Sequence, residues 1–144
     1  MSQDLHGYYL EDLSVGMSAS YAKTVTEADV ILFAGITGDD NPVHINEEFA
    51  AETMFKGRIV HGMFGAGLIS CVAGTRMPGP GAIYLDQTLK FKAPVRIGDT
   101  VTAIVTVKEI VAEKRKVICD TVCTVKGKPV IEGTATYMVD KRPA

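Results

Sequence analysis

Two side chains in one short segment of the sequence can exchange protons. Asp39 supplies a carboxylate and His44, five positions later, supplies an imidazole, both within residues 33–50. Pro42 interrupts any continuous helix here, because its ring fixes its own φ and drives Asn41 towards extended geometry. We therefore expect a rigid turn that aims both side chains at one water molecule, an arrangement suited to general acid–base catalysis.

The same residues allow two other interpretations. Asp and Asn side chains often close turns or cap helices by bonding nearby backbone, and a histidine beside an apolar run is more often structural than catalytic. A metal site built from Asp39, Asp40 and His44 is a weaker alternative. No cysteine or further histidine lies at ligand spacing, and loops that bind hard cations carry more alternating carboxylates. Residue types alone leave all three interpretations open.

The chain should begin with a loosely packed polar arm over residues 2–12, and a strand and a helix should then deliver this turn. Residues 18–25 alternate small and β-favouring side chains, which predicts a strand. Thr26 is a suitable N-cap for a short amphipathic helix over residues 26–36, with Asp29 as a weak capping partner. The helix should end at the Thr37-Gly38 turn and so place Asp39 directly beyond its last residue.

Two further helices are expected after the turn. Asn46 can cap a helix over residues 47–53, whose leading glutamates suit the positive end of a helix. Residues 62–74 are apolar or small at nearly every position, which predicts a helix buried on all sides. Its glycines each lower helix propensity by roughly 1 kcal/mol against alanine, so close packing against a sheet should compensate. Ser70 is the one hydroxyl well inside this run.

The second half of the chain has the pattern of a sheet. Glycines and prolines at residues 77–81 end the helix, and predicted strands follow over residues 82–91, 100–111, 117–125 and 130–139. With the first strand they make a five-stranded antiparallel sheet wrapped around the central buried helix, an α+β arrangement. One helix covers only part of a sheet, so we expect a partner chain, most simply a two-fold homodimer.

Composition excludes several classes of protein. At 144 residues the chain is long enough for a single domain with a real core, and its net charge of −2 argues against a nucleic-acid partner. We expect no signal peptide, because no basic stretch followed by a long apolar run begins the chain, and no membrane span. Three cysteines without a C-x-x-C motif favour buried thiols in a reducing cytoplasm.

The segment around Asp39 also resembles the hydratase signature of the MaoC-like family. The matching residues are Phe33, Ile36, Thr37, Gly38, Asp39, Asn41, Pro42, Val43, His44 and Ala50. Further likeness runs through I-V-H-G-M at 59–63, P-G-P-G-A-I-Y-L at 78–85 and F-K-A-P-V-R-I-G-D-T-V at 91–101. The resemblance implies one hotdog domain over residues 1–144 and (R)-specific hydration of trans-2-enoyl-CoA. The length resembles that of short bacterial hydratases that supply (R)-3-hydroxyacyl-CoA for polyhydroxyalkanoate synthesis.

Particular roles follow from this resemblance. Asp39 and His44 fall on the catalytic pair, Gly62 on the glycine whose backbone N–H binds the thioester oxygen, and Ser70 on a serine that lines the pocket. Asn41 belongs to the motif and either braces the loop or touches substrate. The family needs no cofactor and no metal. We favour Asp39 as the group that exchanges the proton while His44 orients the water, and the reverse assignment stays open because coupled groups share their titration.

The acyl-CoA substrate that the resemblance implies carries an anionic adenosine diphosphate end, so cations should rim the tunnel mouth. Arg58 and Lys90 are our expected substrate contacts. They come from a pool of Lys56, Arg58, Arg76, Lys90, Lys92 and Arg96. Lysines of this kind can equally protect strand edges against pairing. Ala66, Ile69 and Ala73 either line the acyl pocket or belong to the core.

Other functions fit the same residues. The closest rival is a dehydratase that acts on a 3-hydroxyacyl group carried by acyl-carrier protein. A thioesterase of the same fold would need a carboxylate placed to attack, or to activate water at, the thioester carbon. A non-catalytic thioester-binding module has no need for both Asp39 and His44, which disfavours it.

Overall fold

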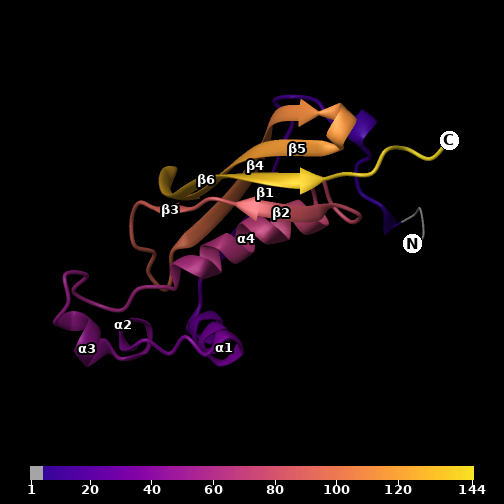
Figure 1. Cartoon of the computed structure of the whole chain (residues 1–144). Coiled ribbons are helices and arrows are strands. Elements are labelled where there is room, and N and C mark those ends of the chain that lie inside the picture. Colours follow the sequence, from indigo (N-terminus) through magenta and orange to yellow (C-terminus); the bar gives the residue numbers. More distant parts are fainter. Residues whose placement is uncertain (1–4) are drawn as a thin grey trace.

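A computed structural model describes residues 5–144 of the chain. Its centre is an antiparallel sheet of six strands in the order β1-β4-β5-β6-β2, with β3 also paired to β6. Figure 1 shows this sheet above the long helix α4, with three shorter helices gathered at one end. The strands are β1 (Ser18–Thr24), β2 (Ile83–Gln87), β3 (Lys90–Phe91), β4 (Thr100–Val111), β5 (Lys116–Val125) and β6 (Lys128–Met138). The helices are α1 (Glu27–Thr37), α2 (Pro42–Ile45), α3 (Glu47–Ala51) and α4 (Gly62–Thr75), with short 3-10 turns η2 (Leu10–Asp12) and η3 (Ala112–Lys114).

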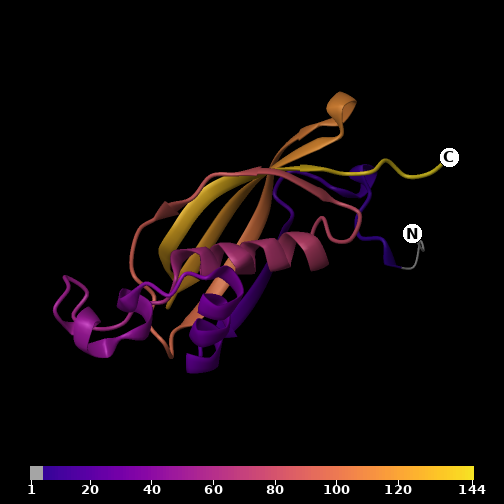
Figure 2. The same ribbon diagram turned by 60° about the horizontal axis from the view of Figure 1, so that its bottom comes forward.

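Figure 2 shows α4 along the curved inner face of the sheet, and buried side chains of both form the core between them. Alternate residues of β4, namely Val101, Ala103, Val105 and Val107, are buried, as expected for a strand with one covered face. The α+β arrangement predicted from the sequence is therefore confirmed.

Within the single chain, α4 is buried on one face only. Leu68, Ile69 and Val72 lie against the sheet, whereas Met63 is 55% exposed and Ser70 is also exposed. The expectation of burial on all sides is wrong for the single chain, because the sheet covers only one side of the helix. Burial of α4 on all sides would require a partner chain to cover this outer face.

The sheet has six strands where the sequence predicted five. The predicted strand over residues 82–91 divides into β2 and β3, because its pairing with β6 shifts register between Tyr84 and Asp86 and lapses after Gln87. Thr88 runs beside β6 between the two paired segments, and a Cβ atom at Gly133 would lie 1.8 Å from the Thr88 carbonyl oxygen. This close backbone approach lies at the break in the ladder.

The N-terminal arm packs more closely than its polar sequence suggests. Residues 2–4 of the predicted loose arm lie outside the described part of the chain. Beyond them, the His6 ring stacks on Tyr9 with centroids 4.0 Å apart, and Leu10 is buried. The expectation of loose packing is wrong for residues 5–12, because Gly7 and Leu10 donate backbone hydrogen bonds to Pro80 and Asp140.

Across residues 5–144, no helix has the length and apolar character needed to cross a membrane.

Candidate active site

The turn after α1 begins where the sequence predicted. Gly38 ends the helix in the left-handed conformation, with φ of 80°, and its N–H donates to the Ala34 carbonyl. Glycine suits this position because other residues are strained at positive φ. The Asn41 side chain then caps α2 by accepting a 3.1 Å hydrogen bond from the Val43 N–H, and Pro42 occupies the first helical position.

Asp39 lies between these two caps and is held by its neighbours. Its N–H donates to the Thr37 hydroxyl at 3.1 Å, and one of its carboxylate oxygens accepts from the Asn41 N–H at 3.4 Å. Asn41 therefore braces the loop through both its side chain and its backbone. The Asp39 residue is otherwise exposed in the single chain, so its carboxylate is available to a ligand.

His44 is buried, and one contact shows which of its ring nitrogens carries the hydrogen. His44 lies in the short helix α2 and not on the expected rigid turn, because the Asn41 cap and Pro42 start a new helix at once. Nδ1 lies 2.8 Å from the Ile59 carbonyl oxygen. A carbonyl only accepts hydrogen bonds, so Nδ1 carries the hydrogen and Nε2 of the neutral ring keeps its lone pair.

A second histidine, His61, joins this pair, and its role was not predicted from the sequence. Its ring stacks on His44 with centroids 3.9 Å apart, and its Nε2 lies 2.8 Å from the backbone oxygen of Asp39. The signal available in the sequence was the His-Gly pair at the start of the apolar helix.

Asp39, His44 and His61 each offer a ligand atom within 4.8 Å of the others, a spacing compatible with a metal ion. The two imidazoles, however, lie face to face with 29° between their planes. Ring nitrogens coordinate along in-plane lone pairs, so these rings do not converge on one ion as they stand. Asp40, which the metal alternative required, is exposed and outside the cluster. The arrangement suits a bound water and proton transfer better than chelation.

Gly62 is the first residue of α4, as predicted. The preceding His61 gives no side-chain cap, and the first amides of a helix carry its positive end. A Cβ atom at position 62 would lie 2.6 Å from the Phe91 ring. Glycine therefore allows β3 to approach the end of the helix that carries these amides.

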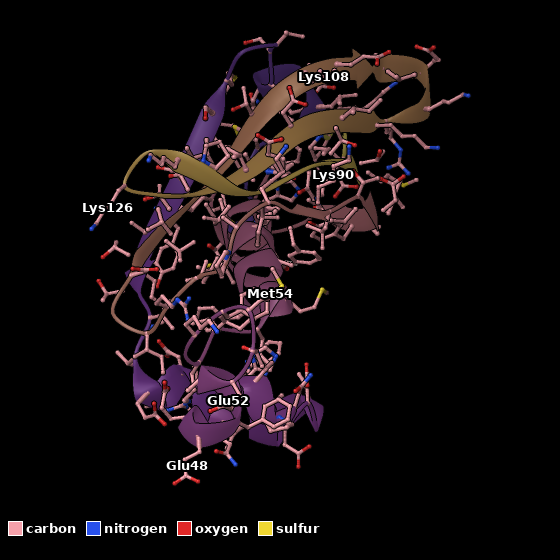
Figure 3. All side chains as sticks on the ribbon, turned by 90° about the vertical axis from the view of Figure 1, so that its left-hand side faces the viewer. Glu48, Glu52, Met54, Lys90, Lys108 and Lys126 are labelled. Atoms are coloured by element: carbon pink, nitrogen blue, oxygen red, sulfur yellow. The ribbon has the colours of Figure 1, made fainter. Side chains whose placement is uncertain are left out.

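Two cavities meet at Asp39. The first, of 490 Å³, is mostly apolar, and its walls include Asp39, His44 and Gly62 together with Phe91 of β3. The second, of 610 Å³, also includes Asp39 and continues along the exposed face of α4 past Ser70. Met54 also lines the first cavity. In Figure 3 its label lies between those of Glu52, at the end of α3, and Lys90, in β3.

Comparison with known proteins places this site in a family. The MaoC like domain matches residues 14–133. An (R)-specific enoyl-CoA hydratase from Rhodospirillum rubrum is 61% identical over 141 residues, with 98% of each chain covered. The chain belongs to the MaoC-like family.

Two further relatives share most of their length with this MaoC-like chain. A 3-hydroxybutyryl-CoA dehydratase from Methylorubrum extorquens is 49% identical, with 99% of this chain and 90% of the relative covered. The solved (R)-hydratase from Aeromonas caviae, involved in PHA biosynthesis, superposes with a TM-score of 0.85 at 40% identity, with 92% and 99% covered. The predicted resemblance, the hotdog fold and the prediction of a hydro-lyase are confirmed.

The remaining predicted site residues of this MaoC-like protein are dispersed. Ser70 lines the second cavity, whereas Asn41, Arg58 and Lys90 line neither cavity. The Arg58 guanidinium forms two hydrogen bonds to Glu27, at 2.9 and 3.0 Å, and donates through Nε to the His44 carbonyl at 2.6 Å. Arg58 thus buttresses the His44 backbone. Ala66 lines the second cavity, while Ile69 and Ala73 belong to the core.

Proposed function

We propose that this protein adds water across the 2,3 double bond of a trans-2-enoyl-CoA to give the (R)-3-hydroxyacyl-CoA. The observation that carries the proposal is the convergence of Asp39, His44 and Gly62 on one apolar cavity. The hydratase from R. rubrum and the dehydratase from M. extorquens, which are named for the two directions of such a reaction, support it.

Water needs a base to attack C3, because it is a poor nucleophile at neutral pH. The lone pair on His44 Nε2 can accept one hydrogen bond from the water, and an Asp39 carboxylate oxygen can accept the other. As the oxygen bonds to C3, the departing proton passes to Asp39 and from there to C2. Hydroxyl and proton then come from one water molecule, and the pair is regenerated without cofactor or metal.

Attack at C3 moves negative charge onto the thioester oxygen. The Gly62 N–H, at the positive end of α4, is the donor that we assign to this enolate oxygen. The apolar wall of the cavity strengthens this interaction, because charges interact more strongly where water is excluded.

The phosphates of coenzyme A require cations near the mouth of the first cavity. Lys92 lines that cavity, and Lys90 lies two positions earlier along the same exposed segment. We assign phosphate contact to these two lysines. Arg58, whose guanidinium already bonds Glu27, is assigned the role of buttress instead of the predicted substrate contact.

A homodimer is part of the same proposal. Strand β2 lies at one edge of the sheet, and its side chains Ile83, Tyr84 and Leu85 are 55%, 39% and 42% exposed. An exposed apolar edge of this kind favours pairing with a second copy. Sedimentation equilibrium should therefore give twice the chain mass of 15.4 kDa, and a monomer at micromolar concentration would contradict the dimer.

We further assign the protein to the cytoplasm, in keeping with its three free cysteines, and to the supply of (R)-3-hydroxyacyl-CoA for polyhydroxyalkanoate synthesis. The A. caviae hydratase, which is involved in PHA biosynthesis, supports the second assignment.

The decisive experiment is a hydration assay on enoyl-CoAs of increasing chain length, with chiral analysis of the product. We expect loss of the enoyl absorbance and formation of the (R)-alcohol. Release of free CoA would indicate a thioesterase. Turnover confined to the carrier-protein thioester would indicate the rival dehydratase, and an (S)-product would contradict the proposed stereochemistry.

A further inference from the structure

His61 touches both halves of the site. Its ring donates to the Asp39 backbone, and its own backbone immediately precedes Gly62, the first residue of α4. The proton-exchanging carboxylate and the amide assigned to the enolate oxygen are therefore linked through one side chain. The loop that carries Asp39 is joined to α4 across 22 residues of sequence by this hydrogen bond.

The tautomer of His61 follows from its partner. The Asp39 carbonyl can only accept, so Nε2 of His61 carries the hydrogen and Nδ1 of the neutral ring has a lone pair. His61 is 3% exposed, and within residues 5–144 its Nδ1 has no hydrogen-bond partner. A buried acceptor without a partner costs free energy, so packing alone favours an apolar residue here. Core packing alone therefore does not explain a histidine at this position.

The same ring also fixes the orientation of His44. The Ile59 carbonyl accepts a hydrogen bond from Nδ1 of His44, and the His61 ring stacks on the face of His44 with ring centroids 3.9 Å apart. These two contacts fix the plane and the direction of the His44 ring, and hence of Nε2. Phe33 packs against His61 in turn, with ring centroids 4.6 Å apart.

We propose that His61 is a positioning residue for the hydration reaction: its Nε2–H sets the place of Asp39 relative to the Gly62 amide, and its ring sets the plane of His44. The inference rests on the proposed function, since it assigns a role within that reaction. His61 itself exchanges no proton with the substrate.

Two substitutions separate the hydrogen bond from the ring stack. His61→Phe keeps an aromatic ring and loses the donor, whereas His61→Gln keeps an amide donor and loses the ring. We expect His61→Phe to lower kcat by about a hundredfold, as for a misplacement of about 1 Å, with KM little changed. His61→Gln should recover part of that loss. Wild-type kcat in His61→Phe would overturn the role of the Nε2–H donor, and wild-type kcat in His61→Gln would overturn the role of the ring.

The matched control is His6→Gln. His6 is also a partly buried histidine stacked on an aromatic ring, and it bonds Asp140 away from both cavities. Its variant should keep wild-type kcat and KM. A loss equal to that of His61→Gln would show that replacing any packed histidine is sufficient, and would overturn the inference.

Hydrogen exchange gives a readout that does not depend on activity. In His61→Phe, amides of residues 39–45 should exchange faster than in the wild type, while those of β4 and β5 should not change. Unchanged exchange in residues 39–45 would overturn the inference even if activity falls. If the wild-type protein hydrates no enoyl-CoA, the proposed function fails, and the exchange measurement still tests the link between His61 and the Asp39 loop.

Discussion

The first residue of α4, Gly62, lies directly against the ring of Phe91. A Cβ atom at position 62 would be 2.6 Å from one ring carbon and 2.7 Å from the next. Phe91 ends the short strand β3, which pairs with β6 and forms part of the wall of the first cavity. The absence of a side chain at one residue thus decides how close this strand comes to the helix end that carries the Gly62 amide.

Gly62→Ala should therefore lower hydratase activity. The added methyl group must push the Phe91 ring aside or move the first turn of α4, and a shift of about 1 Å can cost about a hundredfold in kcat. Gly74→Ala is the matched control, because a Cβ atom there meets nothing within 4 Å. That variant should keep full activity and gain about 0.4–1 kcal/mol of stability. Equal activity in the two variants would contradict the role assigned to Gly62.

Asp39→Asn and His44→Asn should each lower kcat by about 10²–10⁴-fold, because the first removes the group that takes the proton and the second removes the imidazole lone pair that orients the water. Thermal unfolding should change little for Asp39→Asn, since the amide can still accept the hydrogen bond from Asn41. Asp40→Asn makes the same chemical change at the neighbouring exposed carboxylate and should leave kcat unchanged. Steady-state hydration of crotonyl-CoA measures all three variants, and full activity in Asp39→Asn would refute the mechanism.

Lys92→Ala should raise KM for crotonyl-CoA about two- to fivefold, as expected when one exposed ion pair worth up to about 1 kcal/mol is lost. Crotonyl-N-acetylcysteamine lacks the adenosine diphosphate group, so its KM should not change. Lys108→Ala is the control: Lys108 pairs with Asp120 at 3.9 Å, as Lys92 pairs with Glu132 at 3.6 Å, but Lys108 lines neither cavity. An equal rise in KM for both thioesters would show that Lys92 does not contact phosphate.

Alkylation should distinguish the three cysteines. Burial raises the pKa of the Cys119 and Cys123 thiols to about 12, so neither forms appreciable thiolate at pH 8 in the folded protein. Cys71 lies half-buried on α4. Iodoacetamide at pH 8 should label Cys71 first, and labelling of Cys119 and Cys123 should require denaturant. Early modification of Cys123, whose thiol donates to the Gly65 carbonyl, would mean that α4 opens from the sheet.

The sequence predicted elements well where local chemistry decides them. The Thr26 and Asp29 capping box, the helix end at Gly38 and the Asn46 cap all form as expected, so the loop that carries Asp39 could be placed without tertiary information. The strands within residues 100–139 were also recognisable, because one face of each packs against the core and buried residues therefore alternate with more exposed ones.

Features that depend on distant contacts were not predictable in this way. His61 joins the site through a bond to a residue 22 positions earlier, and nothing in its local sequence requires that contact. The division of β2 from β3 occurs where the Thr88 carbonyl approaches Gly133 closely, a contact between distant parts of the sequence. Arg58 was expected to face substrate, but Glu27 in α1 engages its guanidinium, and only the folded chain brings those two residues together.

Asp39 forms part of the wall of both cavities, so a ligand must extend to either side of this carboxylate to fill the two. The reacting carbons of an enoyl thioester would then lie beside Asp39, where the two cavities meet. The carrier group would extend into one cavity and the hydrocarbon tail into the other. The length of tail accepted and the affinity for the carrier group can therefore change independently. Substitutions around Ser70 should shift the preferred acyl length while the inhibition constant of free coenzyme A stays the same.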